Sequence, residues 1–214
     1  MKLYIDSADI AVLERLWDWK IFAGITTNPV ILARDRATPA ALAGRLGVRF
    51  EGEIFFQVSG AAAGQLAESG RELARLLPQR VIVKVPSTPA GFRAMALLEE
   101  EGIRTAATAL FTAGQGIAAA AAGASVIIPF FDRLEKAGGD PPALLEDLVR
   151  LEDAAGKPRV LAASLKSPAQ VLACLRAGLW GVTVAPALAE ELAASPLTDD
   201  AVAKFDEAAG HEEE

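Results

Sequence analysis

The chain has 214 residues, of which 52% are hydrophobic and 23% are charged, and its formal net charge is −7. This length and composition suit one or two globular domains with a substantial core. The acidic balance argues against a nucleic-acid-binding protein, which needs a basic face. The one cysteine cannot form an internal disulfide. The one histidine, His211, lies in the acidic end of the chain, which argues against a histidine-based triad and a zinc site.

Short runs rich in apolar and β-branched residues recur along the whole chain, separated by amphipathic stretches. We predict eight strands, at residues 3–7, 22–27, 53–59, 81–86, 104–110, 125–131, 159–164 and 181–185. Between the third and the fourth of them, residues 63–77 place Leu66, Leu73 and Leu77 on one stripe, which is typical of a surface helix.

Strict alternation of strands with helices predicts a parallel sheet, and eight repeats favour a closed (β/α)8 TIM barrel over an open doubly wound sheet. The chain has no Gly-rich dinucleotide motif after its first strand and no phosphate-binding P-loop. No Pro/Ser-rich linker divides it, so we predict a single TIM-barrel domain over residues 1–214.

One helix more than the barrel needs is predicted near the end of the chain, at residues 198–210, with an acidic tail at 211–214. Pro196 should end the preceding helix, and Thr198 followed by two aspartates predicts the new start. Apolar residues on one side of this helix must cover either the outside of the barrel or another subunit. The sequence leaves both alternatives open.

No segment of the chain predicts export or membrane insertion. The first nine residues contain two aspartates and no apolar core. The longest apolar stretch, residues 117–131, contains Pro129 and is too short to span a bilayer. Together with the single cysteine, this favours a cytoplasmic protein without a membrane or nucleic-acid partner.

Lys84 lies in the middle of the fourth predicted strand, Val-Ile-Val-Lys-Val-Pro. A run of β-branched residues this dense indicates a strand buried on both faces, where a charged side chain is seldom found unless it is paired. Burial should lower the pKa of the ammonium group, and a neutral amine is a nucleophile that can form a Schiff base. The alternative is a lysine that reaches out to solvent.

Polar side chains lie near the ends of most predicted strands, where barrel enzymes carry their chemistry. They are Asp6, Thr26, Asn28, Gln57, Lys84 and Thr108, together with Arg133, Ser164 and Lys166 after the sixth and seventh strands. Structural alternatives exist: Asp6 can cap a helix starting at Ala8, and Asn28 can complete its own turn. Gln57 can bridge neighbouring strands, and Arg133 can be a solvated loop residue. Because one mouth of the barrel would collect all of these residues, we expect a single site.

These residue types fit a site that forms a carbinolamine and then an imine with a ketose. Neutral Lys84 would attack the carbonyl carbon, and the resulting iminium ion would allow the neighbouring C3–C4 bond to break. Asp6 would transfer protons at the C4 hydroxyl, while Thr26 and Asn28 would bind sugar hydroxyls. A phosphate group would be held by the donors after strands six and seven, Arg133, Ser164 and Lys166. We expect no cofactor and no metal.

The chain resembles the transaldolase family, in particular its small subfamily that includes fructose-6-phosphate aldolase. The resemblance covers essentially the whole chain and rests on Thr108 and on residues 3–7 (Leu-Tyr-Ile-Asp-Ser), 24–29 (Gly-Ile-Thr-Thr-Asn-Pro), 83–86 (Val-Lys-Val-Pro), 129–133 (Pro-Phe-Phe-Asp-Arg) and 161–166 (Leu-Ala-Ala-Ser-Leu-Lys). It implies that Lys84 forms the Schiff base, that Asp6 is the acid/base, and that Arg133 and Ser164 lie near the phosphate of a sugar phosphate. It also implies a homo-oligomer, a pentamer or decamer, in which the C-terminal helix reaches a neighbouring subunit.

Two positions separate the branches of this family, and they point in different directions. Gln57 resembles the aldolase branch, whereas Phe130, which would line the substrate pocket, resembles the transaldolase branch. A tyrosine at position 130 could position the water that protonates the enamine and so release dihydroxyacetone, but Phe130 cannot. Gln57 cannot deprotonate water, so a water held near Thr108 would be less activated.

From these residues we predict a Schiff-base transaldolase that moves a dihydroxyacetone unit from a ketose phosphate to an aldose phosphate. One alternative is a fructose-6-phosphate aldolase, which releases free dihydroxyacetone. Another is a non-catalytic sugar-phosphate-binding barrel in which Lys84 is only a contact. An aldolase for deoxyribose phosphate fits Lys84 but not the Thr-Thr-Asn-Pro motif at 26–29.

Overall fold

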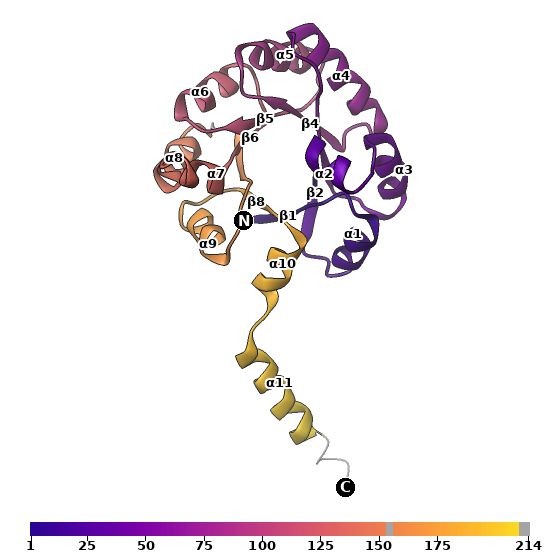
Figure 1. Ribbon diagram of the computed structural model, residues 1–214, viewed down its shortest axis with the longest axis vertical. Coiled ribbons are helices and arrows are strands. Elements are labelled where there is room, and N and C mark those ends of the chain that lie inside the picture. The colour runs from indigo at the N-terminus through magenta and orange to yellow at the C-terminus, as the bar shows by residue number, and fades with distance from the viewer. Residues whose placement is uncertain (153–155, 210–214) are drawn as a thin grey trace.

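Eight parallel strands form a closed barrel in which each strand pairs with the next along the chain and β8 pairs back with β1 (Figure 1). The computed structural model describes residues 1–152 and 156–209. The strands are β1 (Lys2–Asp6), β2 (Phe22–Thr26), β3 (Glu53–Gln57), β4 (Val81–Pro86), β5 (Thr105–Leu110), β6 (Val126–Pro129), β7 (Arg159–Ala162) and β8 (Gly181–Val184). The predicted TIM barrel is confirmed, and the eight strands lie where the apolar runs predict them.

Most of the helices surround the barrel as an outer ring, and the last one extends away from it (Figure 1). In chain order the helices are α1 (Ile10–Trp17), α2 (Pro29–Arg34), α3 (Pro39–Arg49), α4 (Ala63–Leu76), α5 (Pro89–Glu100), α6 (Ala113–Ala121), α7 (Phe131–Lys136), α8 (Pro141–Val149), α9 (Pro168–Arg176), α10 (Pro186–Ala193) and α11 (Pro196–Ala209). The chain forms two helices instead of one after β2 and after β6, so the short helices α2 and α7 begin directly at strand ends. None of the helices within residues 1–152 and 156–209 combines the length and hydropathy that a bilayer-spanning segment needs.

Proline and a hydroxyl residue mark the start of several helices. In α9, Pro168 occupies the first turn, where a missing N–H costs no hydrogen bond, and the Ser167 hydroxyl accepts from the backbone N–H of Gln170 at 3.4 Å. In α5, the Thr88 hydroxyl accepts from the N–H of Gly91 at 3.1 Å in the same way. Ser167 and Pro168 therefore mark the start of α9.

The strands separate two apolar cores because their side chains alternate between the two faces of the sheet. The outer core fills the layer between strands and helices. The inner core fills the barrel and consists of Tyr4, Phe55, Ile82, Ala106, Val126, Ile128, Leu161 and Ala163. Asp6, Gln57, Lys84 and Thr108 each follow an inner-core residue by two positions, so the same alternation points them towards the barrel axis at the C-terminal end of the strands.

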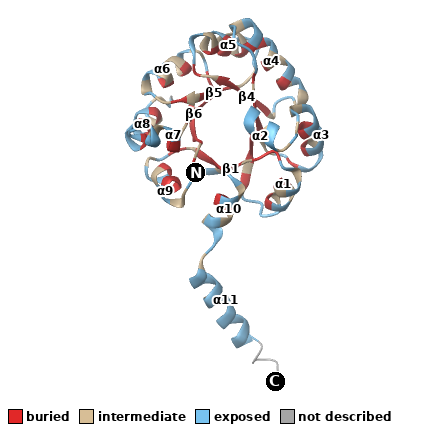
Figure 2. Ribbon diagram, in the orientation of Figure 1, coloured by how far each residue is buried: buried red, intermediate tan, exposed pale blue. Residues whose placement is uncertain are grey.

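The helix predicted at 198–210 begins two residues earlier, at Pro196. Pro196 does not end the preceding helix, since α10 already ends at Ala193; it takes the first turn of α11, and the Ser195 hydroxyl accepts from the N–H of Thr198 at 3.3 Å. α11 extends away from the barrel and has no buried residue (Figures 1 and 2). Residues 210–214, including His211 and the predicted acidic tail, lie outside the described residues.

Candidate active site

A cleft of about 210 Å³ opens at the C-terminal end of the barrel strands. Eight of the predicted site residues line it: Asp6, Thr26, Asn28, Lys84, Phe130, Arg133, Ser164 and Lys166. They come from the ends of β1, β2 and β4, from the starts of α2 and α7, and from the loop after β7. The convergence expected from the strand-end positions is therefore present.

Lys84 lies on β4 with only 4% of its surface exposed. Its Nζ donates a 2.7 Å hydrogen bond to the backbone carbonyl oxygen of Thr27. Burial lowers the pKa of the ammonium group, and the negative charge of Asp6 opposes this shift without cancelling it. Because Lys84 is enclosed by the barrel and lines the cleft, it does not reach outward to solvent.

Asp6 is held by a chain of hydroxyl groups that crosses from β2 to β8. The Thr26 hydroxyl donates to Asp6 Oδ1 at 2.7 Å and lies 2.6 Å from the Thr183 hydroxyl. Since Thr26 gives its only hydroxyl hydrogen to Asp6, Thr183 must be the donor to Thr26. Asp6 does not cap the first helix; that cap is Asp9, whose Oδ1 accepts from the N–H groups of Ala11 and Val12 at 3.0 and 3.2 Å. The Asp6 carboxylate is therefore available to the cleft.

Asn28 is both the cap of α2 and a residue of the cleft. Its Oδ1 caps α2 by accepting from the N–H groups of Val30 and Ile31 at 2.9 and 3.0 Å. This fixes the side-chain amide at the rim of the cleft, with its two N–H donors left for a ligand. Capping α2 therefore positions Asn28 at the cleft and leaves it able to bind a ligand.

The side of the cleft formed by β6 and β7 carries two cations. The Arg133 guanidinium lies over the Phe130 ring at 4.8 Å, and Phe111 meets the same ring edge to face at 5.8 Å. Lys166 is exposed beside them, and its backbone N–H donates to the Gln170 side-chain oxygen at 2.7 Å. Stacking and loop anchoring reduce the freedom of these residues, which favours binding of an anion between them.

Ser164, in the loop after β7, has a backbone conformation that is unusual for a residue with a side chain. Its φ is +60°, in the left-handed region, and its carbonyl oxygen accepts from the N–H of Asp132 at 3.0 Å. Such backbone strain persists only where surrounding contacts impose it, and it concentrates at functional sites. The hydrogen bond from Asp132 links the loop after β7 to α7.

Gln57 and Thr108 were predicted as site residues but do not line the cleft. Gln57 is partly exposed at the end of β3, in register with Lys84, and Thr108 lies on β5 in register with Pro86. Both project inward by strand alternation. The Thr108 hydroxyl is buried and has no hydrogen-bond partner among the described residues. A buried hydroxyl without a partner is a natural position for a bound water.

Two polar cleft residues, Thr183 and Arg34, were not anticipated from the sequence. Thr183 is buried on β8, and the alternation that places Tyr4 and Lys84 inward would have identified it as an inward-facing hydroxyl. Arg34 ends α2, a helix that was not predicted, and it forms two hydrogen bonds of 2.6 and 2.9 Å to Asp35. The Arg34 guanidinium lowers the pKa of the Asp35 carboxyl, and Asp35 also accepts from the N–H of Ala8.

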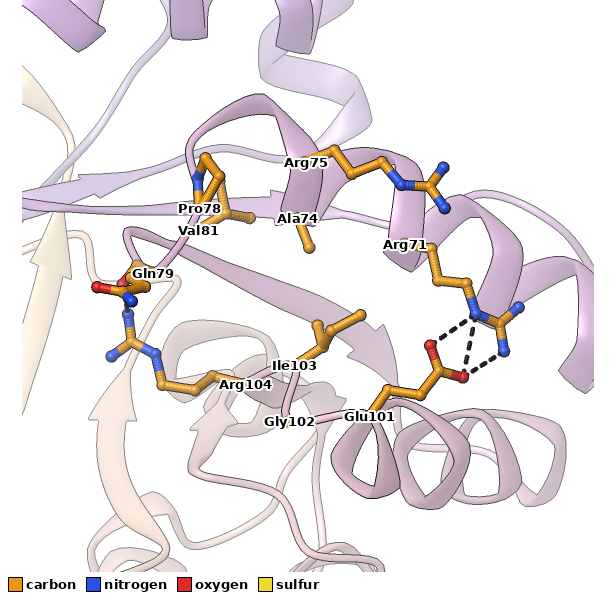
Figure 3. Close-up of a pocket in the computed structure, with 10 residues that line it drawn as sticks. All are labelled: Arg71, Ala74, Arg75, Pro78, Gln79, Val81, Glu101, Gly102, Ile103 and Arg104. Atoms are coloured by element: carbon orange, nitrogen blue, oxygen red, sulfur yellow. Dashed lines mark hydrogen bonds and ion pairs between the residues drawn. The ribbon is translucent and has the colours of Figure 1, made fainter.

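A larger cavity, of about 380 Å³, lies where α4 and α5 lead into β4 and β5, at the opposite end of the barrel (Figure 3). Its side chains include Arg71, Arg75 and Arg104 but no lysine, serine, threonine, cysteine or aspartate. Arg71 is already paired with Glu101, with 2.6 Å between Nη2 and Oε1. The size of this cavity does not make it the reaction site, since its described residues supply no amine, hydroxyl or thiol nucleophile.

The cleft brings together the groups that Schiff-base chemistry requires. A buried amine with a lowered pKa can act as a nucleophile, and a carboxylate held by a neighbouring hydroxyl can exchange protons. The amide of Asn28 and the hydroxyls can orient a polyhydroxylated ligand, while Arg133 and Lys166 can bind a phosphate.

Comparison with known proteins identifies related folds and the family of the chain. A solved structure described as native KDPGal shares 16% sequence identity, with a TM-score of 0.61 over 86% of this chain and 82% of that chain. A cube-shaped, highly porous protein cage designed by fusing symmetric oligomeric domains also shares 16% identity, with a TM-score of 0.60 over 86% of this chain and 63% of that chain. At this identity both likenesses concern the barrel fold alone. The family model for transaldolase/fructose-6-phosphate aldolase matches residues 3–214, and the chain therefore belongs to the transaldolase/fructose-6-phosphate aldolase family.

Proposed function

We propose that the chain is a cytoplasmic Schiff-base transaldolase. It would transfer a dihydroxyacetone unit from fructose 6-phosphate or sedoheptulose 7-phosphate to an aldose phosphate. The observation that carries this proposal is Lys84, a buried amine whose pKa is lowered by burial and which lines a cleft together with the Asp6 carboxylate. A non-catalytic binding barrel would gain nothing from burying an amine without a carboxylate contact, since an exposed lysine binds phosphate at less desolvation cost.

The reaction begins with attack of neutral Lys84 on C2 of the ketose. The carbinolamine loses water and gives an iminium ion, which accepts electrons from the neighbouring bond. Asp6 takes the proton of the C4 hydroxyl, the C3–C4 bond breaks, and the bonding pair remains on the enamine while the aldose phosphate leaves. In the second half, C3 of the enamine attacks the acceptor aldehyde, Asp6 returns the proton to the new hydroxyl, and water releases the product ketose from Lys84.

The binding residues divide between the two ends of the substrate. Thr26 holds Asp6, and the amide of Asn28 would donate to hydroxyls of the dihydroxyacetone unit. Arg133, Ser164 and Lys166 would bind the phosphate at the other side of the cleft. We assign to Gln57 and Thr108 the water that hydrolyses the last iminium ion, because the Thr108 hydroxyl is buried and unpartnered among the described residues.

Transfer is favoured over release of dihydroxyacetone because the cleft lining carries no phenol. The single tyrosine of the chain, Tyr4, donates to Glu53 Oε2 at 2.7 Å and lies in the inner core instead. Phe130 contributes an apolar ring to the cleft where a tyrosine at this position would carry a hydroxyl. No phenol is therefore present there to protonate the enamine before an acceptor arrives. The aldolase remains the alternative function, favoured by Gln57, which cannot act as a base.

An acceptor assay tests this proposal. With fructose 6-phosphate alone we expect little free dihydroxyacetone, because the enamine is not protonated. Addition of erythrose 4-phosphate should give rapid formation of sedoheptulose 7-phosphate, measured by chromatography of the sugar phosphates. Rapid release of dihydroxyacetone without any acceptor would contradict the transaldolase proposal and support the aldolase. The matched variant is Phe130→Tyr, which adds one hydroxyl to the same ring and should shift the product ratio towards free dihydroxyacetone.

We further propose that the protein is a homo-oligomer, a pentamer or decamer, in which α11 packs on a neighbouring copy. Phe205 and Leu197 on this helix are 69% and 81% exposed, and no described residue covers them. Light scattering of the full chain, of 22.4 kDa, should give a multiple of the monomer mass. Phe205→Asp should lower that mass, whereas Ala203→Asp, which adds the same charge to the same helix, should not. A monomeric wild-type protein would contradict this assembly.

A further inference from the structure

A second polar cavity, of about 260 Å³, lies at the N-terminal mouth of the barrel, at the end opposite the Lys84 cleft. Nearly all of its lining residues stand at or just before the first residue of a strand. They are Lys2, Glu53, Ile82, Arg104, Ser125, Val126, Lys157, Arg159 and Trp180. The cavity is smaller than typical drug-sized ligand sites, so it suits an ion or a small polar molecule.

The charge of this mouth is opposite to that of the whole protein. Among the described lining residues, four side chains are cationic and one is a carboxylate, in a chain whose formal net charge is −7. The carboxylate, Glu53, is already satisfied: Arg104 Nη1 lies 2.7 Å from Oε1, and the Tyr4 hydroxyl donates to Oε2 at 2.7 Å. Arg104 also donates to the carbonyl oxygen of Gln79, towards which it reaches in Figure 3. Positive charge therefore remains after the internal ion pair is formed.

Lys2 and Arg159 supply that remaining charge. Lys2 Nζ lies 5.1 Å and Arg159 Cζ 5.6 Å from the centre of the same ring, that of Trp180. Among the described residues, neither cation forms an ion pair with a carboxylate. The buried indole N–H of Trp180 also has no acceptor among them. Stacking on the Trp180 ring restricts both side chains, so an anion that contacts them in the cavity would neutralise their charge at little entropic cost.

We propose that this N-terminal mouth is a binding site for small phosphate-bearing anions, with Lys2 and Arg159 as its principal ligands. Each cation donates charge-assisted hydrogen bonds to phosphate oxygens, and the planar guanidinium of Arg159 can bind two of them at once. The site is separate from the Lys84 cleft and does not depend on the proposed transaldolase reaction. Because it gathers the starts of β1 and β7 and the residue before β8, an anion bound there stabilises the closed barrel.

The test measures binding of inorganic phosphate by equilibrium dialysis at constant ionic strength, with chloride as the balancing anion. The double variant Arg133→Gln/Lys166→Gln removes the two cations that are proposed to bind phosphate in the Lys84 cleft. This variant should still bind one phosphate per chain, at the N-terminal mouth. Adding Arg159→Gln to that background should weaken the remaining site about tenfold, the loss expected for one charge-assisted contact. Arg75→Gln is the matched control, because Arg75 is an exposed arginine of the neighbouring cavity in Figure 3 that does not line this mouth.

A variant with the opposite expected effect strengthens the test. Glu53→Gln removes the only carboxylate among the described lining residues and should tighten phosphate binding, while circular dichroism verifies that each variant is folded. The inference is overturned if the Arg133→Gln/Lys166→Gln protein binds no phosphate, or if Arg159→Gln and Arg75→Gln give the same dissociation constant. A failure of the transaldolase proposal would leave these results unchanged, so the two can be judged independently.

Discussion

Replacing Lys84 with methionine is expected to abolish transaldolase activity and the covalent adduct with fructose 6-phosphate. Methionine preserves most of the side-chain volume within β4 but has no amine, so neither the carbinolamine nor the iminium ion can form. Borohydride reduction in the presence of fructose 6-phosphate should add the reduced sugar to the wild-type protein at Lys84 and leave the variant unmodified, as measured by mass spectrometry. A wild-type protein that stays unmodified would support the non-catalytic binding barrel instead.

The same variant tests the burial of the amine through the pH dependence of stability. Burial lowers the pKa of Lys84 in the folded protein below its ordinary value of 10.5. Between the lowered pKa and 10.5, the unfolded chain binds a proton at this residue that the folded protein does not. Wild-type stability should therefore gain about 1.4 kcal/mol per pH unit from this group as the pH rises through that window.

Lys84→Met lacks this contribution, so the difference in unfolding free energy between the two proteins should change with that slope and become constant above 10.5. Urea unfolding at a series of pH values gives the difference directly. A difference that does not vary with pH would mean that the Lys84 pKa is not lowered. Catalytic activity should fall as the pH drops through the lowered pKa, because only the neutral amine attacks the ketose.

Asp6→Asn is expected to give the second largest loss, about 100- to 10,000-fold in kcat, the range for removing a general acid/base. The amide keeps the size of the carboxylate, and its oxygen can still accept the hydrogen bond from Thr26. Binding of the ketose phosphate should change little, and the borohydride adduct on Lys84 should still form. The expected signature is therefore a protein that is labelled by its substrate but does not turn it over.

Thr183→Val is the control that separates chemistry from positioning at Asp6. It removes the hydroxyl that donates to Thr26 at 2.6 Å but leaves the carboxylate in place. Loss of one such hydrogen bond corresponds to about 1 kcal/mol, or roughly a fivefold decrease in rate. If Asp6→Asn and Thr183→Val reduced kcat equally, Asp6 would be a structural partner of the two threonines and not the acid/base.

Several features of the site follow from short stretches of sequence. The density of β-branched residues around Lys84 marks a strand buried on both faces, and the chain does bury this amine inside the barrel. Ser167-Pro168 marks a helix start that the structure contains. Both are local effects of backbone geometry and side-chain shape. By contrast, Asp6 and Asp9 both precede α1, and only the actual helix start at Ile10 decides that Asp9 is the cap.

The sequence by itself determined the eight strands, the closed barrel and the lysine that the proposed chemistry requires. Strand patterns and burial depend on residues that are close together in the sequence, so they can be predicted from it. Only the tertiary structure decided which distant side chains meet. Thr26 contacts Thr183 across 157 positions because closure of the barrel places β1 between β2 and β8. The same closure brings Lys2 and Arg159 over Trp180 at the other mouth. Contacts of this kind depend on the register and twist of the whole sheet, which no single stretch of the chain specifies.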